Sequence, residues 1–452
     1  MAIRSRVRWG VSLLVLAGFA LVPAARSPHL PGDDGRLVSV VPLGNDGSQC
    51  QWSPSGLAVN ALARLREAAA PGLDASMDVT VPGERAPIRV IHDPRATFSA
   101  VAVDPPRDEV IFQDENLFQT LVFNRLTSTP ARAAMSEPKR RVGGVATKLQ
   151  FNCQLYVDPA SGDIFTVDND TGDTMLMFRQ GVEGNVPPDR ELEVPHGAYA
   201  IVASEAHQEL FITVEHDNAI VVFRKDAADK SAPERLIQGD HTQLADPHGI
   251  VIDEGRDLMF VANHGSTHFS RADAGAAPLA GRGKRNWPID RDHAVPGSGR
   301  ILPPSITAYA RTAEGDAQPV AVIQGPRTQL NWPANMAIDP SRGELFVAND
   351  GGDSILVFRE TDKGDVAPIR VIKGPKTGIK NPTGISLDLK NRELWVSNFG
   401  NYSGTVYRID ANGDVRPLRT IRSAPAGKAA LGIGNPGAVA YDSKRDELLV
   451  PN

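Results

Sequence analysis

Short runs of alternating or β-branched apolar residues recur along most of the chain, and Gly, Asp, Asn and Pro separate them. The segment ISLDLKNRELWVSN (385–398) is typical, because one apolar run ends at Asp388, a polar turn follows, and a second run ends at Asn398. Alternation with a period of two predicts β-strands, and the separating residues predict tight turns. We therefore expect an all-β protein.

One unit of this kind repeats about every 50 residues, and each copy holds two acidic or amide positions ten residues apart. In the third copy Ser204 and Val214 occupy these positions, and the step from Asp253 to Asp339 is longer than the others. The other pairs are Asp104 with Asp114, Asp158 with Asp168, Asp253 with Asn263, Asp339 with Asn349, Asp388 with Asn398, and Asp442 with Asn452. A repeat of four short strands predicts a β-propeller of four-stranded antiparallel blades.

We expect seven blades, with six or eight as alternatives. The last unit stops at Asn452 after two strands, whereas 77–81 and 86–91 resemble the third and fourth strands of a blade. The pattern therefore predicts a ring closed by one blade that the two ends of the chain share.

The domain organisation follows from where the repeat begins. Residues 1–25 combine Arg4, Arg6 and Arg8 with a short apolar run and small residues, which is the pattern of a secretory signal peptide. Residues 26–76 are a non-repeat segment with one expected helix at 57–70, and 77–452 form the propeller. The long step predicts a loop inserted in the fourth blade at 264–304.

The net charge of −6 and the lack of a basic block argue against nucleic-acid binding. No stretch after the signal peptide is apolar enough to span a membrane, so we expect an extracytoplasmic, periplasmic or secreted monomer. An uncleaved N-terminal anchor is the alternative. In an oxidising compartment the two cysteines, Cys50 and Cys153, are expected to form a disulfide.

The succession of PxGIxxD, (L/F)xVAN and IxVF motifs resembles the NHL-repeat β-propeller family from about Met77 to Asn452. The resemblance implies that loops leading into the inner strands share one channel mouth with the loops between second and third strands. It implies a fold rather than an activity, because one fold hosts many functions.

Two rings of residues are expected at that mouth. The first lies five residues before each repeat anchor and comprises Ser99, Cys153, Tyr199, His248, Ala334, Thr383 and Gly437. The second comprises the residues that end the second strands, among them Asn263. Oxygen ligands on a ring suit a hard cation, but Asp and Asn also close turns by bonding to their own backbone.

Two Pro-His-Gly segments place His196 and His248 on neighbouring blades, and Glu215, Asn263 and His264 follow second strands nearby. Imidazole serves as a metal ligand or as a general base near neutral pH. We therefore expect His248 and His196 as candidate catalytic residues, and Glu215, Asn263 and His264 as candidate metal ligands. The alternative is that these histidines only stabilise turns.

Within the resembled family, streptogramin lyases are Mg²⁺-dependent and use a Pro-His loop, which the segment around His248 resembles. Their pattern expects a Glu at a strand-two end, where this chain has Asn263 and Val214. Peptide-amidating lyases of the propeller type hold zinc on several histidines, of which this chain has one in register. Cys153 would join His248 as a zinc ligand only as a free thiolate.

The sequence shows no G-x-S-x-G, H-E-x-x-H or P-loop motif. We expect first a secreted binding scaffold, whose channel-mouth loops recognise a protein, a glycan or a small molecule. The alternative is a lyase or lactonase-like hydrolase that depends on one divalent cation, Ca²⁺, Mg²⁺ or Zn²⁺, with a His base.

Overall fold

The computed structural model describes residues 84–85, 89–91, 93, 98–115, 117–133, 135–169, 171–265, 302–421, 437–445 and 447–450. The chain divides into two compact units, Met1–Asp78 and Val79–Asn452, and every described residue belongs to the second. The expected signal peptide, the helix at 57–70, Cys50 and residues 266–301 of the expected insertion lie outside the described residues.

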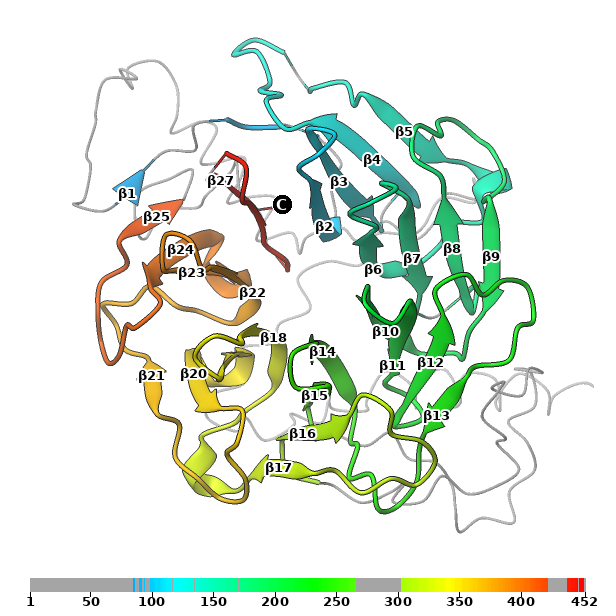
Figure 1. The fold of residues 1–452 in the computed structure, drawn as a ribbon. Coiled ribbons are helices and arrows are strands. Elements are labelled where there is room, and N and C mark those ends of the chain that lie inside the picture. Colours follow the sequence, from blue (N-terminus) through cyan, green and yellow to red (C-terminus); the bar gives the residue numbers. More distant parts are fainter. Residues whose placement is uncertain are drawn as a thin grey trace, which may run out of the picture. The chain divides into compact units, whose positions relative to one another are not determined.

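The second unit is a β-propeller in which six four-stranded antiparallel sheets, the blades, surround one axis (Figure 1). In each blade the order of strands from the axis outward is the order along the chain. The blades are, in order, β2 (Phe98–Asp104), β3 (Glu109–Asp114), β4 (Gln119–Asn124) and β5 (Arg140–Gly143); β6 (Asn152–Val157), β7 (Ile164–Asp168), β8 (Thr174–Phe178) and β9 (Arg190–Glu193); β10 (Ala198–Ser204), β11 (Glu209–Val214), β12 (Ala219–Arg224) and β13 (Arg235–Ile237); β14 (Pro247–Asp253), β15 (Leu258–Asn263), β16 (Ser305–Ala310) and β17 (Ala321–Gln324); β18 (Pro333–Asp339), β19 (Glu344–Asn349), β20 (Ser354–Arg359) and β21 (Arg370–Ile372); and β22 (Pro382–Asp388), β23 (Glu393–Asn398), β24 (Ser403–Arg408) and β25 (Arg419–Ile421).

Four 3₁₀ turns complete the regular elements of the described residues. They are η1 (Val145–Thr147), η2 (Pro326–Thr328), η3 (Asp350–Gly352) and η4 (Phe399–Asn401). η3 and η4 directly follow the second strands β19 and β23 and so belong to the same kind of loop.

The prediction of seven four-stranded blades is wrong, because the described residues form six. The last unit contributes only a two-stranded sheet, β26 (Ala440–Asp442) with β27 (Glu447–Leu449), which lies between β22 and β2 (Figure 1). The N-terminal strand β1 (Glu84–Arg85) does not extend this pair, because it pairs in parallel with β25 of the sixth blade.

Side chains still link the two-stranded sheet to its neighbours. Arg89 forms an ion pair with Glu447, and Leu449 packs with Ile91 against the apolar cluster around Phe98. Residues 89–91 and 447–449 therefore meet beside the first blade, although they do not complete a shared four-stranded blade within the described residues.

The core lies between neighbouring blades, so that the second strands are buried on both faces. All six residues of β11 are buried, and Leu210 and Ile212 pack with Phe165 and Val167 of the preceding blade. Burial on both faces explains why second strands such as ELFVAN (344–349) read as nearly continuous apolar runs.

Gly-Asp dipeptides at 315–316, 364–365 and 413–414 fasten the fourth, fifth and sixth blades to the blade before them. The carboxylate of Asp365 accepts a hydrogen bond of 2.7 Å from the backbone N–H of Arg327, and Asp414 accepts one of 2.8 Å from Lys376. Gly315, Gly364 and Gly413 each pair with an outer strand of the previous blade, as Gly364 does with Ile323. The dipeptide therefore repeats for a structural reason.

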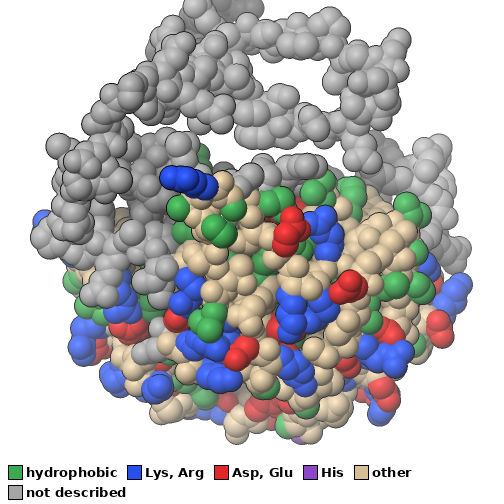
Figure 2. Space-filling view, turned by 90° about the horizontal axis from the view of Figure 1, so that it is seen from above, with side chains coloured by type: hydrophobic (Ala, Val, Ile, Leu, Met, Phe, Trp, Pro, Cys, Tyr) green, Lys and Arg blue, Asp and Glu red, His purple; other side chains and the backbone are tan. Residues whose placement is uncertain are grey.

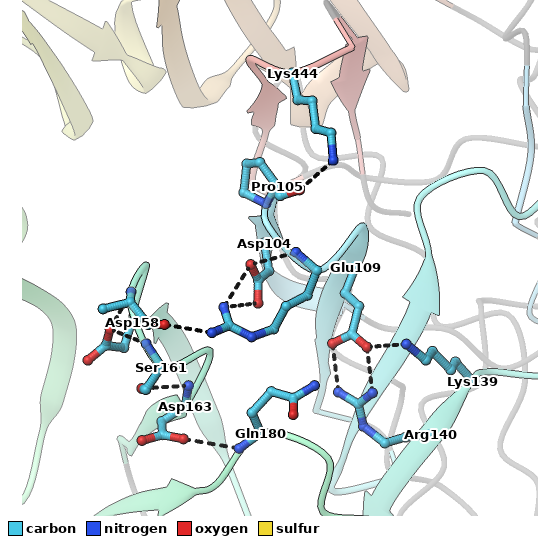
Figure 3. A network of polar contacts seen from close by, with 12 residues as sticks. Asp104, Pro105, Glu109, Lys139, Arg140, Asp158, Ser161, Asp163, Gln180 and Lys444 are labelled. Carbon is cyan, nitrogen blue, oxygen red and sulfur yellow. Dashed lines mark hydrogen bonds and ion pairs between the residues drawn. The ribbon is translucent and has the colours of Figure 1, made fainter.

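The repeat anchors close turns at one end of the propeller. Asp104 accepts hydrogen bonds from the backbone and the guanidinium of Arg107, and Glu109 accepts two from Arg140 (Figure 3). Lys444, which follows β26, donates to the carbonyl of Pro105 and so ties the two-stranded sheet to the first blade (Figure 3).

On the face drawn in Figure 2, Lys and Arg side chains are interspersed with Asp and Glu. Among the described residues, no helix has the length and apolar character needed to cross a membrane.

Candidate functional site

The loops at one end of the axis repeat one backbone arrangement. In five blades, the residue directly after the second strand donates its N–H to the carbonyl of the residue directly before the inner strand, at 2.9–3.1 Å. The pairs are Asn169 to Phe151, Glu215 to Gly197, His264 to Asp246, Asp350 to Trp332, and Phe399 to Asn381. We call this end of the propeller the histidine face, and the two residues of each pair the post-strand and pre-strand residues.

A third position lies beside the pre-strand and post-strand residues, namely the second residue of each inner strand. We call these three positions of a blade its frame. Strand pairing aligns the first residue of the inner strand with the end of the second strand, as Pro247 aligns with Asn263 and Pro333 with Asn349. The first ring expected from the sequence is therefore in register in six blades, with Ser99, Cys153, Tyr199, His248, Ala334 and Thr383 at equivalent positions.

The second expected ring includes Val214 and Asn452, which lies outside the described residues, and its other members are buried amide and carboxylate groups. Asn263 is fully buried, its Oδ1 accepts from the N–H of Ala245 at 3.0 Å, and its Nδ2 donates to Thr307 at 3.1 Å. Asn349 and Asn398 make the same kinds of bonds in their blades. Asn263 therefore supports the loop. Its side-chain oxygen is engaged by Ala245, so it does not face the cluster described next as the expected metal ligand would.

In the fourth blade all three positions of the frame carry metal-ligating groups. Asp246, His248 and His264 each offer one ligand atom, and these atoms lie within 4.8 Å of one another. The Nδ1 of His248 is 3.5 Å from a carboxylate oxygen of Asp246, and the two imidazole rings stack with centroids 3.5 Å apart. The Nε2 of His264 is buried and has no hydrogen-bond partner among the described residues.

The third blade supplies a carboxylate to this cluster. Glu215 places one oxygen 3.2 Å from the Nε2 of His248 and the other 3.3 Å from the Nε2 of His216. Asn169 also donates to Glu215, at 3.2 Å. Glu215 is thus fixed by its neighbours and in turn fixes the orientation of the His248 ring.

The protonation states suit a cation. Burial, with the charge of His248, lowers the pKa of His264 to about 3, so that its imidazole is neutral and able to ligate. Burial alone would raise the pKa of Glu215, but hydrogen bonds from His216 and Asn169 and the charge of His248 together lower it. The cluster therefore presents neutral imidazole beside ionised carboxylate near neutral pH.

The first two blades contribute Ser99, Glu115 and Cys153 to the same face. Burial raises the pKa of Glu115 to about 7, against the opposing effect of hydrogen bonds from Ser99 and Cys153. Burial and the nearby Glu115 and Glu215 carboxylates raise the pKa of the Cys153 thiol, which is therefore protonated at neutral pH. A protonated thiol is a poor zinc ligand. The expected disulfide from Cys153 to Cys50 stays a prediction, because Cys50 lies outside the described residues.

His196 lies beside this cluster without joining it. Its Nδ1 is 3.0 Å from Asp173, and its ring lies 5.0 Å from that of His216. Of the expected site residues, the structure thus brings together Glu215, His248 and His264, and it leaves His196 and Asn263 in other contacts.

Sequence reasoning missed three residues of this face. Asp246 precedes His248 by two positions in DPHG, Trp332 precedes the counted Ala334 by two positions, and Glu115 directly follows the counted Asp114. The signal that would have found them is the recurrence of two loop positions, the residue before each inner strand and the residue after each second strand.

Fold and site together define a β-propeller with a cluster of titratable side chains at one end of its axis. No protein-family model and no curated protein sequence matches the chain. Among solved structures, the chain is similar to Kuenenia stuttgartiensis hydrazine synthase, at 11% identity and a TM-score of 0.54, over 80% of this chain and 96% of that one. At this identity the likeness shows the β-propeller fold and nothing of the activity.

Proposed function

We propose that this protein is a binding β-propeller that holds one divalent transition-metal ion on Asp246, His248 and His264 and captures a small ligand beside it. The observation that carries the proposal is the convergence of three ligand atoms within 4.8 Å, all from one blade. Zinc binds nitrogen and oxygen at about 2.0–2.2 Å, so small side-chain rotations would complete the set. Three protein ligands leave a position open for a ligand or water.

The surroundings of His248 support the proposal. A metal-bound histidine commonly donates its other ring N–H to a carboxylate, which fixes the tautomer and the ring orientation. Glu215 lies 3.2 Å from the Nε2 of His248 while Asp246 lies on the Nδ1 side. Glu215, expected from the sequence as a metal ligand, fits this supporting role.

The donor set also narrows the choice of metal. Ca²⁺ and Mg²⁺ prefer oxygen ligands, whereas two imidazoles with one carboxylate favour Zn²⁺ or another late first-row ion. Of the three cations considered from the sequence, Zn²⁺ fits these residues best.

A second candidate function is a metal-dependent lyase or lactonase-like hydrolase, and Glu115 is the observation that favours it. A carboxyl group with a pKa of about 7 is suited to accept or donate a proton near neutral pH. A metal ion would supply polarisation of a substrate carbonyl. In this version Glu115 replaces His248 as the acid–base group, because His248 is assigned to the metal.

The N-terminal pattern and the repeated motifs add a location and a family to the proposal. We infer an extracytoplasmic location from the signal-peptide pattern at 1–25 and membership of the NHL-repeat family from the motifs in 77–452. Both are inferences from the sequence pattern alone.

Elemental analysis by mass spectrometry tests the metal site. Purified protein is incubated with Zn²⁺, dialysed and compared with His264→Ala and Asp246→Asn, and with His196→Ala as a control on the same face. We expect about one equivalent of zinc in the wild type and the control and a loss in the other two variants, with all four folded by circular dichroism. Equal zinc in His264→Ala, or none in the wild type, would refute the site.

The enzyme candidate needs a separate assay. Glu115→Gln is expected to keep its zinc and to lose turnover in a screen of lactones and cyclic esters. If the zinc-loaded wild type turns over none of these compounds, the binding function stands and this form of the enzyme candidate is rejected.

A further inference from the structure

The pre-strand position imposes the same unusual backbone on four blades. Gly197, Asp246, Trp332 and Asn381 all have positive φ angles, of 83°, 56°, 50° and 43°. Gly, Asp and Asn tolerate this left-handed region, whereas a bulky aromatic residue there is an outlier. Trp332 is therefore the one residue of these four that local backbone preference does not explain.

The indole of Trp332 is also placed where a ligand can reach it. The side chain is 51% exposed, and it stacks on His264 with ring centroids 5.1 Å apart and an interplanar angle of 12°. One face of the indole is thus held against the histidine cluster. Strained residues persist where the surrounding structure over-determines them, and such residues gather at ligand sites.

The other two positions of the fifth blade carry a small side chain and a carboxyl group. The second residue of the inner strand is Ala334, where the two preceding blades carry Tyr199 and His248. The post-strand residue is Asp350, whose backbone N–H is bonded to the carbonyl of Trp332 at 3.1 Å. Its Oδ1 is buried and has no hydrogen-bond partner among the described residues.

The charged groups around Trp332 and Asp350 bear on which class of ligand can bind there. Burial raises the pKa of Asp350, with the neighbouring Asp353 adding to the effect and a hydrogen bond from Asn381 opposing it. An exposed indole face suits a ring that is apolar on its faces, and Asp350, whose backbone is bonded to that of Trp332, offers a carboxyl group to hydroxyl donors at the edge of such a ring.

We propose that Trp332 and Asp350 form a carbohydrate subsite beside the fourth-blade cluster, with a neutral sugar ring stacked on the indole and its hydroxyls donating to the Asp350 carboxylate. The subsite rests on the proposed binding function, for which it names the ligand class. Asn381, which directs its amide toward Asp350 at the edge of the next blade, is a further polar neighbour.

The test uses Trp332→Asn, because Asn381 occupies the equivalent backbone position with a φ of 43°. Isothermal titration calorimetry compares the zinc-treated wild type with Trp332→Asn, Trp332→Phe and Asp350→Asn, and with Tyr402→Ala as an exposed aromatic control outside the subsite. The probes are maltotetraose, cellotetraose and chitotetraose, with tetramethylammonium as a cationic probe.

We expect at least one oligosaccharide to saturate the wild type at millimolar concentration, and its affinity to fall about tenfold or more in Trp332→Asn. Trp332→Phe should retain part of the affinity, Asp350→Asn should weaken it, and Tyr402→Ala should leave it unchanged. Trp332→Asn should melt no lower than the wild type, because asparagine relieves the left-handed backbone. A merely structural tryptophan would instead lower the melting temperature.

Three results would overturn the proposal: no saccharide saturates, binding survives Trp332→Asn, or only tetramethylammonium binds in a manner that depends on Trp332. Zinc content measured on the same samples separates this failure from failure of the metal site. Trp332→Asn should keep its zinc, whereas His264→Ala should lose it.

Discussion

Glu360 stands at a position where three other blades place a cation. It directly follows the third strand β20, as Arg125 follows β4, Lys225 follows β12 and Arg311 follows β16, and each donates its backbone N–H to the turn that precedes its second strand. Lys225 reaches the anchor Asp158 of the previous blade at 2.7 Å, and Arg125 reaches Asp442 in the same way.

The carboxyl group of Glu360 instead lies beside another carboxyl group, that of Asp253, which is the anchor of the previous blade. Both side chains are almost wholly buried, and Arg256 lies 2.6 Å from Glu360 and 3.7 Å from Asp253. Burial and the charges of Asp253 and Asp339 raise the pKa of Glu360, although Arg256 lowers it. The single guanidinium of Arg256 is therefore shared between two buried carboxyl groups.

The sign of the effect on stability follows from this pKa. Because the carboxyl of Glu360 ionises more readily in the unfolded chain, the folded state loses stability as the pH rises through the unfolded value of about 4.3 and on to the folded pKa. Glu360→Gln keeps the volume, removes the like charge and can donate to Asp253. We expect it to stabilise the propeller by about 1–2 kcal/mol at pH 7, since a close pair of charges at an effective dielectric constant of about 20 is worth a few kcal/mol and Arg256 offsets part of it.

Thermal unfolding followed by circular dichroism between pH 4 and 8 checks this. The difference in melting temperature between Glu360→Gln and the wild type should be near zero at pH 4 and grow toward pH 8. Glu344 of the same blade gives a matched control, because hydrogen bonds from Arg370 and Arg342 lower its pKa despite its burial. Glu344→Gln should destabilise at pH 7, and that difference should shrink as the pH falls below about 4.5. A Glu360→Gln variant that is less stable than the wild type at pH 7 would show that Arg256 holds Glu360 as a favourable carboxylate.

Three further perturbations test other parts of the structure. Tyr407→Phe removes a buried hydroxyl that donates to the carbonyl of Thr377 at 2.6 Å, and chemical denaturation should show a loss of about 1–2 kcal/mol, whereas an unchanged midpoint would mean that water replaces the bond. Gly239→Ala forces a Cβ onto a backbone with φ +143° and within 2.2 Å of the next blade's carboxylate, so it should lower the melting temperature by several degrees, and a neutral result would show that this fastening yields easily. Mass spectrometry of non-reduced peptides should show Cys153 linked to Cys50 in secreted protein, while protein purified with both thiols free and unable to oxidise would refute the pairing.

The sequence predicted the class of fold because its information is local and repeated. Residues 385–398 already hold two strands and a turn, and the same spacing recurs around the ring. The number of complete blades was overestimated, because an apolar run such as 86–91 shows that a strand is favourable but not which edge it will join. The described part of the N-terminal segment pairs with β25 instead.

For the site, the sequence pointed to the loops that carry the histidine cluster, and it left out Asp246, Glu115 and Trp332. Asn263 and His264 are neighbours, but only His264 faces the cluster, because successive side chains at the end of a strand point to opposite sides. The sequence did not indicate Asp246 as a ligand, because an Asp before Pro-His is typical of a turn. Trp332 carries no motif, and its interest appears only when its backbone angle and its stacking on His264 are seen together.

On the histidine face, backbone groups hold the loops together, while the side chains of the same residues are left to contact a ligand. Its recurrent bond joins two backbone groups, Phe399 to Asn381 as well as His264 to Asp246, and so is indifferent to the side chains. Each of these five blades therefore presents three side chains that can be exchanged, provided that the pre-strand residue tolerates a left-handed backbone where φ is positive. Asn381, Thr383 and Phe399 of the sixth blade could be exchanged for Asp, His and His without altering the main chain, which would transplant the fourth-blade constellation to a new place on the ring. A propeller built in this way can change its specificity one blade at a time while its architecture is conserved.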